Sequence, residues 1–306
     1  MSCRITSCST CSVSPSPRGP PRRAPTAHVD LHCHSTASDG ECPPEQVPVR
    51  AHEANLAAIA LTDHDTLDGV KAATTAALPL GVRVVPGCEF SVKAPWGEMH
   101  LLGYFLTPGH LALEAFLTET REARRRRGHE MVQRLQRAGV PIDLADVEAE
   151  AKDGALGRPH VARALIRRGA ADDFTDAFAH FLGRGKPGYV PKPLPTLEAV
   201  TALIHEVGGV AVAAHLGERG TEPQLRQFQS DGLDGIEIRH PRHSPAAEAR
   251  LGRLAERLGL VVSGGSDWHG DGDEGASHAP LGGMDVPLEW LEQLERRRGN
   301  SSRNPT

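Results

Sequence analysis

Histidine and acidic side chains stand at the ends of predicted β-strands in this 306-residue chain. Residues 29–40, VDLHCHSTASDG, place His32 and His34 two apart at the end of a short apolar run, and Asp39 follows five positions later. Because side chains alternate between the faces of a strand, the two imidazoles share a face and could bind one ion together. The full set of candidate ligands, from six segments, is His32, His34, Asp39, His64, Glu89, His100, His215, Asp267 and His269.

The composition of this set predicts chemistry with divalent cations. Imidazole and carboxylate groups together suit Zn²⁺, Mn²⁺ or Fe²⁺. Nine groups are too many for one ion and predict two or three, with a carboxylate as a bridge. Clustered ions of this kind make hydroxide available near neutral pH and neutralise phosphate oxygens, so no protein nucleophile is needed. A single HxH pair could instead be a strand that carries polar residues into a loop, but that explanation does not extend to all nine positions.

The nine candidate ligands can lie at one edge of a sheet only if the strands that carry them run parallel. Short apolar runs alternate with helix-like stretches, a pattern typical of β–α units with crossover helices, and it predicts an α/β barrel or an open α/β sheet. The active site of such folds lies at the carboxyl ends of the strands. The predicted strands cover residues 28–34, 56–65, 81–92, 98–106, 208–215, 233–240 and 260–269.

The alternation stops between residues 107 and 190, where only helical patterns occur. This stretch is predicted to be a helical insertion domain. Residues 121–168 contain 12 Lys or Arg against 7 Asp or Glu, a local charge of +5 in a chain whose net charge is −5. The run of four arginines at 124–127 could follow an RNA backbone or form a solvated helix face.

The remaining composition limits the classes of function. The negative net charge argues against a protein whose whole surface is basic and binds nucleic acid. No apolar run approaches the ~20 residues of a membrane span. Residues 1–27, rich in Ser, Pro and Arg and containing Cys3, Cys8 and Cys11, are predicted to be a disordered tail without a signal peptide. We expect a cytoplasmic protein with no membrane and no obligate protein partner, and a second disordered tail over residues 299–306.

The motifs resemble a known superfamily. DLHCHSTASDG, LTDHDTLDG, PGCEFS, MHLLGYF, GGVAVAAH and GGSDWHG are similar to successive motifs of the PHP (polymerase and histidinol phosphatase) metal-dependent phosphoesterases, from residue 28 to about residue 283. GRPHVARAL and GKPGYVP resemble the branch with 3',5'-nucleoside-bisphosphate phosphatases and a 5'-to-3' exoribonuclease. The resemblance implies a distorted (β/α)7 barrel, here over residues 28–106 and 191–298, with the small helical domain at 107–190 inserted.

The resemblance also implies a trinuclear centre, with Mn²⁺ favoured and Fe²⁺ or Zn²⁺ as alternatives. Matching motif by motif, Glu89 would bridge two of the ions, and a metal-bound hydroxide would be the nucleophile. The implied sets of ligands are His32, His34, Glu89 and Asp267; Glu89, His100 and His215; and Asp39, His64 and His269.

Further residues are candidates for substrate contacts or proton transfer. The resemblance places Arg158 and His160 as phosphate contacts, although Arg158 could also be a plain first-turn residue and His160 a solvent-facing one. Lys186 and Tyr189 are further candidates in a segment that also reads as a return loop. Asp63 and Asp65 could orient His64 or assist with protons. Glu237 and His240 end another strand and are expected to line the pocket, with His240 as a candidate acid for the leaving group.

These features favour hydrolysis of terminal phosphates on nucleotides such as 3',5'-bisphosphonucleosides, or on 5'-phosphorylated short RNA. One alternative is a phosphatase for a small metabolite such as histidinol phosphate, which the helical insertion and GRPH motif disfavour. Another is a non-catalytic metal-bound module that docks on a polymerase or RNA; loss of ligands would mark it, and the sequence shows no such loss.

Overall fold

The structure is a computed structural model that describes residues 27–151, 156–272 and 278–301, with side chains described as far as residue 299. The predicted N-terminal tail, with its three cysteines, lies outside the described residues except for Ala27. Among the helices that are described, none has both the length and the apolar character needed to cross a bilayer.

Eight strands form one curved sheet in the order β7-β6-β5-β4-β3-β2-β1-β8. Their alternating apolar residues and short buried runs, such as LAAIAL in β2, suit strands covered on both faces. The strands are β1 (His28–Cys33), β2 (Leu56–Leu61), β3 (Arg83–Ala94), β4 (Gly97–Tyr104), β5 (Val210–Ala213), β6 (Gly235–Arg239), β7 (Val261–Gly264) and β8 (Val286–Pro287).

The sheet departs from a regular (β/α)7 pattern at β4. The β1–β3 and β5–β7 groups are parallel, but β4 runs antiparallel to both β3 and β5. The turn at Pro95 and Trp96 is too short for a crossover helix, and a two-strand hairpin is the connection that such a turn permits. Because of this reversal, the early residues of β4 lie at the edge where the other strands end.

The two ends of the sheet meet at the carboxyl edge and nearly close a barrel. The amide of His34 donates to the carbonyl of Trp268 at 2.9 Å, and the amide of Asp267 donates to the carbonyl of His32 at 2.9 Å. The segment after β1 therefore binds the segment after β7. The expected α/β barrel is confirmed, and its closure lies where the candidate ligands are concentrated.

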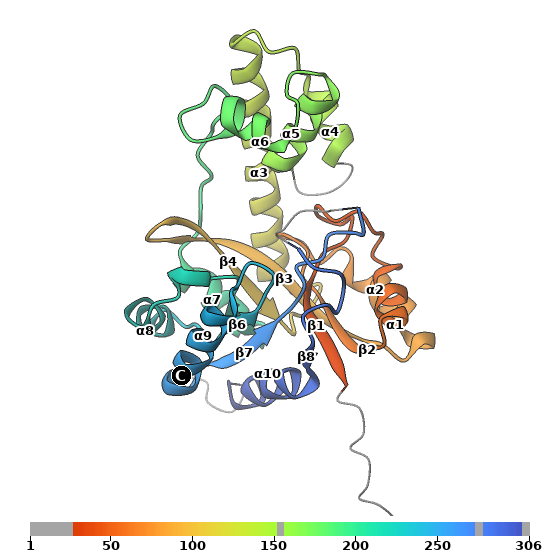
Figure 1. Cartoon of the computed structure of the whole chain (residues 1–306), viewed down its shortest axis with the longest axis vertical. Helices are drawn as coiled ribbons and strands as arrows, with labels where there is room; N and C mark the ends of the chain where they lie inside the picture. The colour runs from red at the N-terminus through yellow and green to blue at the C-terminus, as the bar shows by residue number, and fades with distance from the viewer. Residues whose placement is uncertain (1–26, 152–155, 273–277, 302–306) are drawn as a thin grey trace, which may run out of the picture.

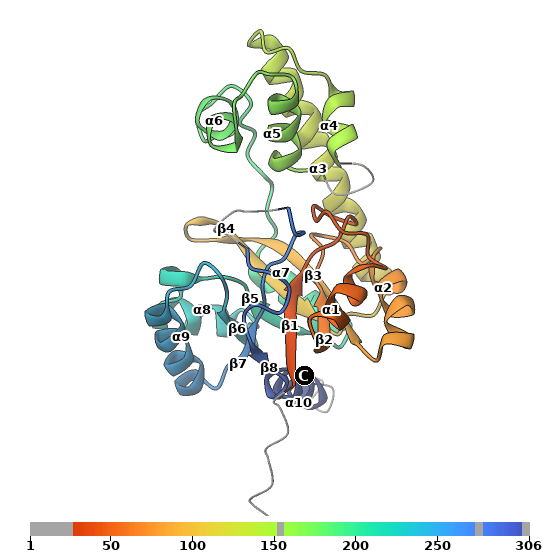
Figure 2. The same ribbon diagram turned by 45° about the vertical axis from the view of Figure 1, so that its right-hand side comes forward.

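Helices cover the outer face of the barrel (Figure 2). Several begin at side-chain caps that the sequence supplies, including Thr196 before α7 and Ser244 before α9, whose hydroxyls accept bonds from the amides of Ala199 and Ala247. The covering helices are α1 (Val47–Glu53), α2 (Val70–Ala77), α7 (Leu197–Glu206), α8 (Glu222–Ser230), α9 (Pro245–Leu258) and α10 (Leu288–Ser301). Helix α10 extends three residues into the predicted C-terminal tail.

The helical segment of residues 111–182 extends above the barrel (Figure 1). It contains α3 (Leu111–Arg137), α4 (Leu144–Ala151), α5 (Arg158–Arg167), α6 (Phe174–Ala177) and a short π-helix (Phe178–Leu182). The long helix α3 joins two cores. Leu113 and Leu117 pack with the barrel, whereas Met131 and Leu135 pack with α4 and α5.

Candidate metal centre

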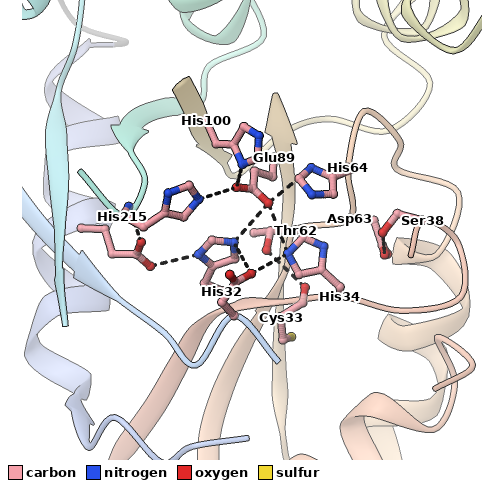
Figure 3. A network of polar contacts seen from close by, with 12 residues as sticks. His32, Cys33, His34, Ser38, Thr62, Asp63, His64, Glu89, His100 and His215 are labelled. Atoms are coloured by element: carbon pink, nitrogen blue, oxygen red, sulfur yellow. Dashed lines mark hydrogen bonds and ion pairs between the residues drawn. The ribbon is translucent and has the colours of Figure 1, made fainter. Parts of the chain in front are cut away.

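Glu89 lies at the middle of the candidate ligands (Figure 3). It is 1% exposed and stands within β3, beside the end of β2. Its Oε2 atom lies 3.2 Å from Nε2 of His32, 3.2 Å from Nε2 of His34 and 3.4 Å from Nδ1 of His64. One carboxylate oxygen thus faces three imidazole rings that come from the ends of β1 and β2.

The second oxygen of Glu89 faces the other side of the barrel. Oε1 lies 2.7 Å from Nδ1 of His100 on β4 and 3.1 Å from Nε2 of His215, which follows β5. Glu89 is therefore placed between two groups of histidines. A carboxylate in this position could contact two cations.

Asp267 completes the group around β1. Its Oδ1 atom lies 3.3 Å from Nε2 of His32 and 3.2 Å from Nε2 of His34, the same nitrogens that face Glu89. The ligand atoms of His32, His34, Glu89 and Asp267 lie within 4.8 Å of one another, and all four residues are buried. One cation could be bound by all four.

A further group lies beside the loop after β1. Asp39 has Oδ1 3.4 Å from Nε2 of His269 and Oδ2 3.8 Å from Nε2 of His64. With His34, these residues form a second set of four close ligand atoms. The structure therefore brings all nine sequence-predicted candidates together at one end of the barrel.

Several of these atoms are buried without a hydrogen-bond partner. Such groups destabilise a fold unless something else satisfies them, and a divalent cation does so for imidazole and carboxylate donors. The residues therefore fit bound divalent ions. The atoms are His32 Nε2, His34 Nδ1 and Nε2, Asp39 Oδ1, His64 Nδ1 and Glu89 Oε2.

The electrostatics of the cluster also favour cations. Burial alone would raise the pKa of Glu89 and Asp267, but neighbouring histidines outweigh it and hold both pKa values well below the usual range. Burial opposes protonation of His34, yet its contacts with Asp267 and Glu89 raise its pKa to about 10. Ionised carboxylates at this depth require positive charge nearby, which protons or metal ions can supply.

Two buried acids hold the ligands in place from behind. Glu237 Oε1 lies 3.0 Å from Nδ1 of His32, and its Oε2 accepts the amide of His215 at 2.7 Å. Asp30 accepts the amides of His32, Ser266 and Gly282. Asp30 could not be recognised from the sequence, because an acid at an inward position of a strand has no signature until its partners are known.

Asp63 and Asp65, the two acids beside His64 in the sequence, bind other segments of the chain. Asp63 accepts bonds from the amide and hydroxyl of Ser35 and from the hydroxyl of Ser38, each at 2.7 Å, and so fixes the turn that carries Asp39. Asp65 is 1% exposed and lies 2.5 Å from Nη2 of Arg124 on α3. That ion pair ties helix α3 to the barrel. No hydrogen bond or ion pair joins either acid to His64 in the described structure.

His240 and Glu237 are fully buried, contrary to the expectation that they line the pocket. The Nε2 atom of His240 lies 3.3 Å from Oδ2 of Asp267, and its Nδ1 accepts the amide of Arg242 at 3.1 Å. With both nitrogens engaged behind Asp267, His240 is placed to orient that carboxylate. It has no exposed path to a leaving group.

A cavity of about 450 Å³ opens on the cluster. Arg242 follows β6, and Arg163 and Phe174 reach it from the insertion. His278 also lines it, with Nδ1 2.6 Å from the carbonyl of Asp267. These four were missed because none stands at a strand end. The cavity is lined by Asp39, Glu41, His64, Glu89, His100, Pro159, Arg163, Phe174, His215, Arg242, Asp267, His269, Gly272 and His278.

The predicted substrate contacts divide into two pairs. Arg158 and His160 line a neighbouring cavity of about 180 Å³ that also reaches His64. His160 is 2% exposed, and its Nδ1 accepts the amide of Gly157, so the solvent-facing alternative is wrong. Burial lowers the pKa of His160 to about 4. By contrast, Lys186 is exposed and Tyr189 is half-buried, and the described cavities include neither.

Comparison with known proteins identifies the family. Residues 30–139 match the model of the PHP domain. The chain is 35% identical over 247 residues to the 5'-3' exoribonuclease Rnm of Salmonella typhimurium, covering 78% of this chain and 84% of that protein. The chain belongs to the PHP domain family. As a PHP protein it is a metal-dependent phosphoesterase, and divalent metals are its cofactors.

Other PHP relatives cover the chain equally well. It is 36% identical over 265 residues to the 3',5'-nucleoside bisphosphate phosphatase of Chromobacterium violaceum, over 81% of this chain and 90% of that protein. A solved protein of Bifidobacterium adolescentis, described as a candidate metal-dependent phosphoesterase, superposes with a TM-score of 0.81 at 34% identity, over 89% of this chain and 97% of the other. A match over 89% of the chain must include part of residues 107–190.

Proposed function

We propose that this phosphoesterase removes terminal phosphates from 3',5'-bisphosphonucleosides or from 5'-phosphorylated short RNA. The observation that carries the proposal is the cluster around Glu89, whose buried and unpartnered atoms open on a cavity lined by Arg163 and Arg242. The guanidinium groups of these two arginines can donate hydrogen bonds to phosphate oxygens. The relatives named as a bisphosphate phosphatase and an exoribonuclease support the choice of substrate.

The ligand sets are part of this proposal. Their members are His32, His34, Glu89 and Asp267; Glu89, His100 and His215; and Asp39, His64 and His269, with Mn²⁺ as the favoured ion. When bound, divalent ions lower the pKa of coordinated water and neutralise phosphate oxygens.

The chain's own residues prepare the site. Glu237 fixes the ring of His32, Asp63 fixes the loop of Asp39, and His240 orients Asp267. Hydrogen bonds from residues behind the ligands fix the orientation of each ligand toward its ion. We further propose that residues 107–190 form an inserted helical domain, supported by the separate apolar cluster around Met131 and Leu165. It provides Arg163 and Phe174 as one wall of the cavity.

Purified protein and defined substrates test the proposal. Phosphate release is measured from adenosine 3',5'-bisphosphate, 5'-phosphorylated RNA and histidinol phosphate, with Mn²⁺, Fe²⁺ or Zn²⁺, together with the metal content of the protein. We expect turnover of one of the first two in excess of histidinol phosphate. Absence of turnover with both across all three metals would remove this proposal.

A further inference from the structure

A second cavity lies beside the metal centre, on the side of His215. Figure 3 shows His215 and His64 on opposite sides of Glu89. A cavity of about 400 Å³, which we call the Trp96 cavity, shares His100 and His215 with the main cavity, whereas Asp39 and His64 are not part of its wall. Its lining residues are Trp96, Glu98, Met99, His100, Ala214, His215, Leu216, Arg219 and Arg242.

Trp96 presents a fixed aromatic ring to this cavity. Its Nε1 donates to the carbonyl of Glu98 at 3.1 Å, and its ring lies 6.0 Å from the ring of Phe228 on α8, with an angle of 69° between the planes. The guanidinium of Arg219 lies over the ring of Trp96, 5.5 Å from its centroid. Aromatic rings and arginine side chains are the groups on which proteins stack the bases of single-stranded nucleic acids.

The turn that carries Arg219 is held in place by two other segments. Arg250 on α9 donates to the carbonyl of Gly217 at 2.7 Å and to the carbonyl of Gly220 at 2.6 Å. The Nε2 atom of His243 accepts the amide of Gly217 at 3.0 Å. Arg219 itself is exposed and forms no ion pair with the residues that the structure describes. Its guanidinium is therefore held beside the aromatic ring without an acidic partner.

The two classes of proposed substrate differ in what the reacting phosphorus carries. In a 3',5'-bisphosphonucleoside, the 3'-phosphorus carries one nucleoside, through the 3'-oxygen. In 5'-phosphorylated RNA, the first internal phosphorus also carries the next nucleoside, through its 5'-oxygen. In either substrate a water oxygen bonds to phosphorus, the bond from phosphorus to the 3'-oxygen breaks, and that oxygen takes up a proton from the water. Only the RNA needs a place for a second nucleoside beside the reacting phosphate.

We propose that the Trp96 cavity binds the nucleoside on the 3' side of the scissile phosphate of short RNA, with its base stacked against Trp96 and Arg219. This inference rests on the proposed function, and it extends hydrolysis to the first phosphodiester of the RNA. Leu216 and Met99, each 4% exposed, give the cavity an apolar surface for the sugar and base. Because every base has a face that can stack, the subsite accepts RNA of any sequence.

Two substrates that differ only in this nucleoside test the inference. Adenosine 3',5'-bisphosphate and 5'-phosphorylated ApA both release adenosine 5'-monophosphate from the 3'-oxygen, but only the dinucleotide carries a second adenosine on the reacting phosphate. For each substrate, kcat/KM is measured with the wild type, Trp96→Leu and Arg219→Gln. We expect Trp96→Leu to lower the ratio of dinucleotide to bisphosphate by about 5- to 150-fold, the effect of stacking one base on an aromatic ring. Arg219→Gln should lower the same ratio.

A second pair of tryptophan and arginine provides the control. The guanidinium of Arg239 lies 5.3 Å from the centroid of the ring of Trp290 on α10, and the described cavities include neither residue. Trp290→Leu should leave the ratio unchanged, and Trp96→Phe, which keeps an aromatic ring, should lower it less than Trp96→Leu. The ratio remains informative if a variant folds less well, because the folded fraction cancels between substrates. An unchanged ratio in Trp96→Leu, or an equal fall in Trp290→Leu, would overturn the inference.

Binding separates this inference from the proposed function. If the wild type hydrolyses only the bisphosphate, the dinucleotide is measured as an inhibitor of that reaction, and equal inhibition of wild type and Trp96→Leu would overturn the subsite. If the wild type hydrolyses neither substrate, the proposed function fails, and calorimetry on the metal-containing protein replaces kinetics. Weaker binding of the dinucleotide to Trp96→Leu, with unchanged binding of the bisphosphate, would then support the subsite, whereas equal affinities for the dinucleotide would refute it.

Discussion

Glu237 accepts a hydrogen bond from the ring of His32, with 3.0 Å between Glu237 Oε1 and His32 Nδ1. Although burial opposes it, the charges of His32 and His240 lower the pKa of Glu237 to about 2, so the carboxylate is ionised at neutral pH. It must therefore receive a proton from Nδ1, which leaves Nε2 of His32 facing Glu89 and Asp267. One buried acid thus selects which nitrogen of a proposed ligand points into the centre.

Replacing this acid should weaken metal binding without removing a ligand. In Glu237→Gln, one end of the side chain becomes a donor, so it cannot accept from both His32 and the amide of His215. We expect metal affinity to fall by about 10- to 100-fold, as measured by chelator competition. Glu256→Gln, at an exposed position of α9, is the control. Wild-type affinity in Glu237→Gln would contradict the role of Glu237.

Removing the charge of Glu89, the proposed bridging carboxylate, should have a larger effect. Glu89→Gln keeps the shape of the side chain but removes the charge that faces five histidines. We expect the protein to bind fewer metal ions than the wild type. We also expect kcat to fall by more than about 100-fold, the upper limit for a residue that contacts a metal ligand but not the metal. Elemental analysis and steady-state kinetics measure the two effects. Full metal content with normal kcat would show that Glu89 does not bridge.

The barrel should tolerate no side chain at Gly265. A Cβ atom there would lie 2.4 Å from both the backbone N and the Cβ of His32, so the strand end would have to shift. We expect Gly265→Ala to lower the free energy of unfolding by about 1–3 kcal/mol or more and to lower metal affinity, as measured by urea unfolding and chelator competition.

A second glycine provides the control for that substitution. At Gly252 on α9, an added Cβ meets only Ile238 Cδ1 at 3.8 Å. Alanine in a helix should stabilise the protein there by about 0.5–1 kcal/mol. If the two variants had equal stability, the close approach at Gly265 would be refuted.

His160 should make the protein sensitive to acid. Its pKa falls from 6.5 to about 4 on burial, so below pH 6.5 the unfolded chain binds a proton that the folded chain does not. Stability therefore decreases as the pH falls from about 6.5 toward 4, by on the order of 2 kcal/mol at pH 5. His160→Gln retains an acceptor for the amide of Gly157 and does not titrate.

Urea unfolding at pH 7 and pH 5 compares the two proteins. We expect His160→Gln to lose less stability on acidification than the wild type. Identical losses would show that protonation of His160 does not contribute.

Metal removal should lower the unfolding temperature. A ligand that binds only the folded state stabilises it in proportion to the logarithm of its concentration, by about 4 kcal/mol at a thousand times its Kd. Chelation of the wild type should lower Tm, and added Mn²⁺ should restore it progressively. Asp267→Asn should show a much smaller response in the same thermal scans. An equal response in both would place the ion elsewhere.

The barrel and the nine-residue cluster could be predicted from the sequence because each depends on a local pattern. Strand ends are marked by apolar runs that stop at His, Asp or Glu, and parallel topology then brings these ends together. The antiparallel direction of β4 alters this only slightly, since His100 stands near its start and so reaches the same edge.

Contacts between distant segments could not be predicted. No local pattern shows that Asp65 of the barrel pairs with Arg124 of α3, or that His240 is buried behind Asp267 instead of facing substrate. Arg242 and His278 lie in irregular segments, where periodicity carries no information about direction. The roles of these side chains depend on packing, which a single sequence does not display.

The hydrogen bonds that join His34 to Trp268 and Asp267 to His32 connect two segments that are far apart in the chain. Four of the proposed ligands lie within residues 32–64, whereas two lie at residues 267 and 269. A fragment produced by premature termination or by proteolysis before β7 would hold an incomplete coordination sphere, and it would be inert. On the proposed ligand sets, hydrolysis requires a chain that extends past residue 269.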